Sequence, residues 1–138
     1  MLFRSKGQVR LLFDVCHNVD GARAFVEALG HRGYARAGQR TIPGFVAILV
    51  DKDCDGILDL LRPVLAPLRL FACGSERSWQ ASDVIRLSAR HRDLAFFPDF
   101  AAAWQNAAAD LAGRADPAAV CGSVHAVGEV MAGLGLLR

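Results

Sequence analysis

Short apolar runs alternate with amphipathic stretches along this chain, and this alternation constrains its fold more than any other feature. The apolar runs predict five strands, over residues 9–15, 45–50, 68–73, 94–97 and 118–121. Each run is followed by apolar residues at helical spacing. Strand followed by helix, five times over, predicts a three-layer α/β domain with a mostly parallel sheet covered by helices on both faces.

The clearest helical pattern is an apolar stripe over residues 100–111. The other helices are expected over residues 20–29, 57–64, 81–88 and 124–134. Gly30 and Gly33 should end the first of them, and Pro63 should limit the second. Residues 51–56 read as a polar loop.

Composition excludes several classes of protein. A chain of 138 residues fits one domain, and its 53% apolar content allows a sizeable core. The net charge of +2 is too small to imply a nucleic-acid partner, and no run of basic residues occurs. The longest apolar stretch, residues 45–50, is far too short to span a membrane, and the first ten residues do not resemble a signal peptide. We therefore expect a cytoplasmic protein without membrane partners.

The polar residues that follow each strand are the candidates for a site. Ligands of open parallel sheets bind beyond the carboxyl ends of the strands, so these residues should converge on one edge. They lie at positions 14–18, 51–55, 73–77 and 122–123.

Residues 14–18 combine a carboxylate, an imidazole and an amide in Asp14, His17 and Asn18. Such a set can bind hydroxyl, ammonium, phosphate or carboxylate groups. The alternative is that Asp14 and Asn18 hold the turn while Asp20 caps the next helix.

Similar alternatives hold at the other strand ends. Lys52 could pair with an anion, whereas Asp53 or Asp55 could cap the next helix or position a cation. The spacing is not that of a calcium loop, because Arg62 stands where a bidentate Glu is required. Ser123 precedes the last helix and could cap it, or help its start to bind a carboxylate or phosphate.

We predict no metal site and no catalytic residue. The four cysteines (Cys16, Cys54, Cys73 and Cys121) form no close pair, so buried free thiols are favoured over a zinc site that would include His17 and His125. His31 and His91 are expected at exposed helix ends. No phosphate loop, dinucleotide-binding glycine motif or nucleophile elbow occurs.

Four blocks of the sequence resemble one enzyme family. Residues 12–24, LFDVCHNVDGARA, resemble the D-G-A-H-N-P-x-G-A signature of folylpolyglutamate/dihydrofolate synthases, members of the Mur ligase superfamily. Residues 46–61 are similar to the family's apolar strand, K-D turn and leucine-rich helix, and residues 71–77 to its next strand and T-x-x-x-x-R segment. Residues 121–130, CGSVHAVGEV, resemble its G-S-L-Y-x-x-G-E-V ending. The blocks keep the family's order and spacing over nearly the whole chain.

The resemblance implies a single Rossmann-like domain over residues 1–138, of the Mur ligase C-terminal type. It implies an ATP-dependent ligase that adds L-glutamate to dihydropteroate or folates through an acyl phosphate. ATP and Mg²⁺ would be held mainly by an N-terminal ATP-binding domain that this chain lacks, with no cofactor expected in this chain alone. The residues implied are Asp14, His17 and Asn18 for the nucleotide, and Ser123, Lys52, Asp53 and Arg77 for glutamate or the lining of the cleft.

Departures from the family pattern bear on substrate preference. Val15 replaces the usual Gly, Val19 the usual Pro, Cys73 a common Thr and His125 a common Tyr. The alternative to the ligase is a stand-alone, non-catalytic binding module that kept the fold.

Overall fold

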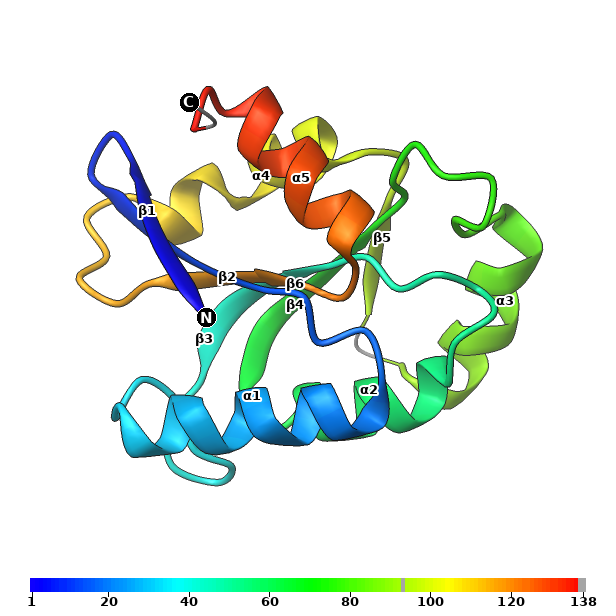
Figure 1. Cartoon of the computed structure of the whole chain (residues 1–138), viewed down its shortest axis with the longest axis horizontal. Coiled ribbons are helices and arrows are strands. Elements are labelled where there is room, and N and C mark those ends of the chain that lie inside the picture. The colour runs from blue at the N-terminus through cyan, green and yellow to red at the C-terminus, as the bar shows by residue number, and fades with distance from the viewer. Residues whose placement is uncertain (93, 137–138) are drawn as a thin grey trace.

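The computed structural model describes residues 1–92 and 94–136, which contain six strands and five helices (Figure 1). The strands are β1 (Leu2–Lys6), β2 (Val9–Asp14), β3 (Ile42–Val46), β4 (Leu65–Phe71), β5 (Ala95–Phe97) and β6 (Ala118–Cys121). The helices are α1 (Val19–His31), α2 (Cys54–Leu61), α3 (Ala81–Arg90), α4 (Phe100–Leu111) and α5 (Val124–Gly133).

The strands form one mixed sheet in the order β1-β2-β6-β3-β4-β5. All neighbouring pairs are parallel except β1 and β2, which form an antiparallel hairpin. The mostly parallel α/β fold is therefore confirmed. The sequence does not predict β1, because four of its five residues are exposed and it shows no apolar run.

The helices cover both faces of the sheet, as predicted (Figure 1). On one face, Phe25 of α1 and Ile57 of α2 pack in a core with Leu12, Val46 and other sheet residues. On the other face, residues of α4 and α5 pack with sheet residues such as Leu11 and Phe45 in a second core. Both cores follow from the alternation of side chains along each strand. No helix among the described residues is long and apolar enough to cross a membrane.

The predicted strand over residues 45–50 is wrong at both ends, since β3 covers Ile42–Val46. The Ala47 N–H still donates to the Cys121 carbonyl of β6 at 3.1 Å, but Ile48 and Leu49, although buried, do not continue the ladder. The Trp79 indole donates to the Ile48 carbonyl, and the Val50 N–H donates to the Arg77 carbonyl at 2.8 Å. The apolar residues Ile48 and Leu49 are therefore explained by their burial and not by membership of a strand.

Among the other boundaries that differ from the prediction, two have a clear local cause. The strand β4 begins at Leu65 and not at residue 68. Leu65 already pairs with Ile42 of β3, and the pairing continues from Leu68 after an irregularity at which Ala66 and Pro67 are exposed. The helix α2 begins at Cys54, because the Asp53 side chain accepts the Gly56 N–H at 3.0 Å and caps the helix.

His91 is fully buried, which contradicts the predicted exposure. Its Nε2 lies 2.8 Å from Asp55 Oδ1, and its Nδ1 lies 3.3 Å from a guanidinium nitrogen of Arg62. A guanidinium can only donate, so Nδ1 accepts and Nε2–H donates to the carboxylate. Asp55 of α2 lies 36 positions earlier in the sequence and Arg62, at the end of α2, lies 29 positions earlier, so no local pattern reveals either partner.

Candidate functional site

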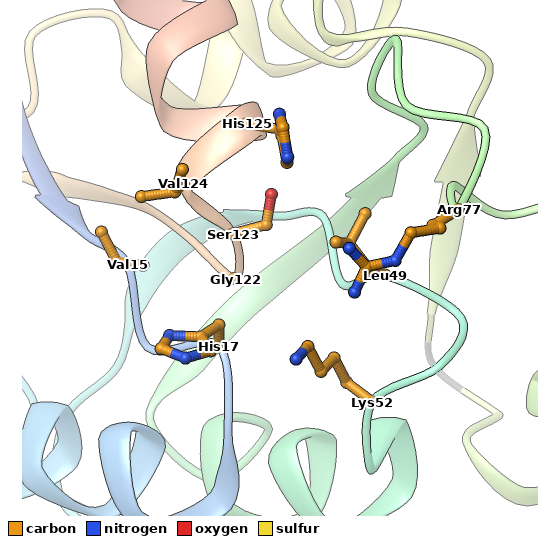
Figure 2. Close-up of a pocket in the computed structure, with 9 residues that line it drawn as sticks. All are labelled: Val15, His17, Leu49, Lys52, Arg77, Gly122, Ser123, Val124 and His125. Carbon is orange, nitrogen blue, oxygen red and sulfur yellow. The ribbon is translucent and has the colours of Figure 1, made fainter.

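A cavity of about 280 Å³ lies at the carboxyl edge of the parallel strands (Figure 2). Four loops line it, each following one of the strands β2, β3, β4 and β6. The lining residues are Val15, His17, Leu49, Lys52, Arg77, Gly122, Ser123, Val124 and His125. This is the edge at which the sequence predicts a site.

The cavity is lined by positive and neutral side chains. Lys52 and Arg77 contribute positive charge, His17 and His125 contribute imidazoles, and none of the nine lining residues is acidic. Figure 2 shows the ammonium end of Lys52 directed across the cavity toward His17. Such a set of donors fits the oxygens of a phosphate or a carboxylate.

Arg77 has a competing partner at the rim. It donates to the Asp51 carboxylate at 2.5 Å, and both side chains are about half exposed. The hydrogen bond from Arg77 lowers the pKa of Asp51. An anion in the cavity would therefore share this guanidinium with Asp51.

The start of α5 forms one wall of the cavity. Ser123 is buried, and its Oγ accepts the Ala126 N–H at 3.0 Å, which caps the helix. Gly122, directly before it, has a φ of +116°, and a Cβ there would lie 2.4 Å from the Ala47 carbonyl oxygen. The close approach of Gly122 to the backbone beyond β3 thus places the cap residue at the cavity.

The loop that carries Arg77 is held on two sides. Its Trp79 and Arg77 carbonyl bond to the segment after β3, as described above. On the other side, the Gly74 N–H donates to Glu129 Oε1 of α5 at 2.6 Å. Within the loop, Ser78 Oγ accepts the Cys73 N–H at 2.9 Å. These contacts fix the loop between the segment after β3 and α5.

The structure brings four of the seven predicted site residues to the cavity: His17, Lys52, Arg77 and Ser123. The other three lie outside its lining. The Asn18 side chain accepts the Gly21 N–H at 2.7 Å and caps α1, so Asn18 rather than Asp20 is the cap. Asp53 caps α2 in the same way.

Asp14 faces a smaller neighbouring cavity, which it shares with Val15. Its carboxylate accepts the Cys16 N–H at 3.0 Å and lies 3.5 Å from the ammonium group of Met1. Asp14 therefore shapes the turn that leads to His17.

Sequence reasoning did not select the apolar part of the lining. Val15, Leu49 and Val124 line the cavity beside the polar residues, and Gly122 forms its wall. The position of Gly122 between a buried strand and a helix cap was a usable signal, because such a tight junction favours glycine.

Among residues 1–92 and 94–136, no three His, Cys, Asp or Glu side chains are grouped closely enough to hold a metal ion. The four cysteines are free and buried, as small apolar side chains would be. Burial raises the pKa of the Cys54 thiol to about 11. A hydrogen bond with Cys16, together with burial, raises that of Cys121 well above its usual value.

These thiols should react slowly in the folded chain. Because the raised pKa of Cys54 keeps it protonated at pH 8, little of the nucleophilic thiolate is present. Titration with Ellman's reagent at pH 8 should therefore show slow labelling in buffer, and rapid labelling of all four cysteines in guanidinium chloride. Rapid labelling of the folded chain would contradict this burial.

Comparison with known proteins gives matches among solved structures. No protein-family profile matches the chain, and no curated protein sequence does. The bifunctional folylpolyglutamate synthase/dihydrofolate synthase of Yersinia pestis, complexed with AMPPNP and manganese, is 31% identical with a TM-score of 0.78. That match covers 98% of this chain and 30% of the Yersinia protein.

Two further structures agree. FolC of E. coli, in complex with DHPP and ADP, is 25% identical with a TM-score of 0.71, over 97% of this chain and 30% of its own. Folylpolyglutamate synthase of Mycobacterium tuberculosis, complexed with ADP, is 27% identical with a TM-score of 0.67, over 96% and 33%. Over nearly its whole length the chain is therefore the counterpart of one domain of the folylpolyglutamate synthase/dihydrofolate synthases, consistent with the C-terminal domain that its sequence resembles.

Proposed function

We propose that residues 1–138 form the C-terminal domain of an ATP-dependent ligase that joins L-glutamate to dihydropteroate or folates. The observation that carries the proposal is the cavity at the carboxyl edge, where Lys52, Arg77 and the start of α5 offer positive charge and hydrogen-bond donors to an anion. The names of the similar structures support the substrate class.

In this proposal the domain positions charged groups and carries no catalytic residue. Lys52, Arg77 and His17 would bind anionic oxygens of the nucleotide and of L-glutamate when the domain closes over an N-terminal ATP-binding domain. The Ser123 oxygen accepts from α5, but its O–H can still donate to a glutamate carboxylate. Asp14 and Asn18 would act through the turn that presents His17.

The residues present fit the anionic part of ATP but offer no ligand set for Mg²⁺ in the described part of the chain. The metal would thus be held by the N-terminal domain. When bound there, ATP with Mg²⁺ supplies the phosphoryl group that activates the acceptor carboxylate. The basic side chains of this chain would neutralise phosphate charge from the opposite side of the cleft.

The test is an assay of ADP release that depends on L-glutamate. The chain is mixed with a separately produced ATP-binding domain of a folylpolyglutamate synthase/dihydrofolate synthase, with ATP, Mg²⁺ and dihydropteroate, after circular dichroism shows both parts folded. We expect ADP release only when both parts and L-glutamate are present. No release from two folded parts would count against the ligase and favour a stand-alone binding module.

A further inference from the structure

Four arginines that lie far apart in the sequence gather at the end of the sheet opposite the cavity. Arg10 is at the start of β2, Arg32 follows α1, Arg40 precedes β3, and Arg114 lies between α4 and β6. Figure 1 shows these segments together at one end, with the cavity loops at the other. We call these four residues the arginine cluster.

Two members of the cluster share one aromatic ring. The guanidinium carbons of Arg10 and Arg32 lie 5.3 and 5.9 Å from the centre of the Phe3 ring. Arg10 also lies 5.9 Å from the ring centre of Tyr34 and donates to its hydroxyl at 3.3 Å. The two rings thus hold two positive charges near each other.

The other two members surround a single carboxylate, Asp116. Arg40 forms an ion pair with it. The pKa of Asp116 is lowered first by the hydrogen bond from Arg40, and also by the charges of Arg40, Arg114 and Arg10. Within the described residues, Nε of Arg114 is buried and has no hydrogen-bond partner. Among the described residues, Arg40 is the one member of the cluster that forms an ion pair, and Asp116 is its partner.

A chain with a net charge of only +2 has no general excess of basic residues to explain this local one. Like charges held close together repel each other, and a bound anion relieves that repulsion. A planar guanidinium group can donate two parallel hydrogen bonds to phosphate oxygens. Several neighbouring guanidinium groups can therefore bind several phosphate groups that are linked in sequence.

We propose that the arginine cluster binds a condensed phosphate chain, a ligand of at least three phosphate groups joined in sequence. A single-stranded nucleic acid fits less well, because it needs open aromatic faces for its bases, and guanidinium groups lie over Phe3 and Tyr34. The site is at the opposite end of the domain from the cavity, so it does not depend on the proposed ligase function.

The test is a titration of the ¹⁵N-labelled chain with sodium tripolyphosphate, followed by NMR. We expect saturable shifts in the amides of residues 32–40 and 112–116, weaker at higher salt. The double variant Arg10→Gln/Arg32→Gln should bind about tenfold more weakly, because two charge-assisted contacts are lost. The double variant Arg23→Gln/Arg86→Gln, with the same net charge, is the matched control and should bind like the parent chain.

If Arg10→Gln/Arg32→Gln fails to fold, the double variant Arg10→Lys/Arg32→Lys is used instead. It keeps the two positive charges but loses the planar guanidinium groups, so it should bind tripolyphosphate measurably more weakly than the parent chain. The proposal is overturned if no saturable shifts appear near the cluster, or if both Gln variants lose affinity equally. Shifts confined to residues 49–53 and 122–126 would also overturn it and place the anion in the cavity. Tighter binding of a single-stranded oligonucleotide than of tripolyphosphate at the cluster would replace the proposed ligand.

Discussion

Replacing Gly122 by alanine is expected to lower the free energy of unfolding by about 3 kcal/mol. The new Cβ would lie 2.4 Å from the carbonyl oxygen of Ala47, and the φ of +116° is unfavourable for any residue with a Cβ. The contacted atom is backbone, so it cannot turn aside as a side chain could. Relief requires the turn before α5 to move, which would also displace Ser123 and Val124 at the cavity. Urea denaturation followed by circular dichroism measures the change.

Gly128 provides a matched control. It lies within α5, and a Cβ there meets nothing within 4 Å. Alanine is a better helix former than glycine, so Gly128→Ala should be neutral or stabilise by up to about 1 kcal/mol. Equal effects of the two substitutions would show that the junction between Gly122 and the segment after β3 is not tight.

Replacing Asp110 by alanine should destabilise the fold by about 2 to 3 kcal/mol, because it leaves a buried charge without its counter-ion. Arg69 of β4 is only 5% exposed. It donates to Asp110 Oδ2 at 2.5 Å and to Asn106 Oδ1 at 2.9 Å, which ties the sheet to α4. Thermal and urea unfolding both measure the loss.

Two variants test the cause of this loss. Asp20→Ala removes one partner of an exposed pair with Arg23 and should cost less than about 1 kcal/mol. Arg69→Met/Asp110→Ala removes both charges, and should be more stable than Asp110→Ala alone, since no unpaired charge remains buried. A double variant less stable than the single one would contradict the account of a stranded guanidinium.

The elements whose bounds are predicted correctly are those with a clear apolar pattern within their own residues. The helix α4 and the strand β6 have the predicted bounds, because an apolar stripe and a short buried run identify them without help from other segments. The strand β1 could not be found, since its pairing with β2 leaves it exposed. The buried segment after β3 has the apolar pattern of a strand. The Trp79 indole that bonds to Ile48 lies 31 residues further along the chain, so no local pattern shows that this segment bonds to a loop.

The candidate site was predictable in its place but not in its detail. The rule that ligands bind beyond parallel strands brings His17, Lys52 and Ser123 to one cavity. It does not tell whether a polar side chain faces the cavity or its own backbone, and Asn18 and Asp53 both turn to a helix N-terminus. Which of the two a side chain faces depends on the backbone conformation of its turn, and the spacing of residues in the sequence does not determine that conformation.

The central claim is that the basic groups of the cavity act on bound anions when this domain faces an ATP-binding domain. The direct measurement is glutamate-dependent ADP release by the two-part mixture, with the variant Lys52→Ala/Arg77→Ala in place of the parent chain. We expect its kcat/KM to fall about 100-fold, since two charge-assisted contacts are removed. The control Arg23→Ala/Arg86→Ala, which removes two exposed arginines outside the cavity, should keep the parent rate. Equal rates for the two variants, both folded, would contradict the claim.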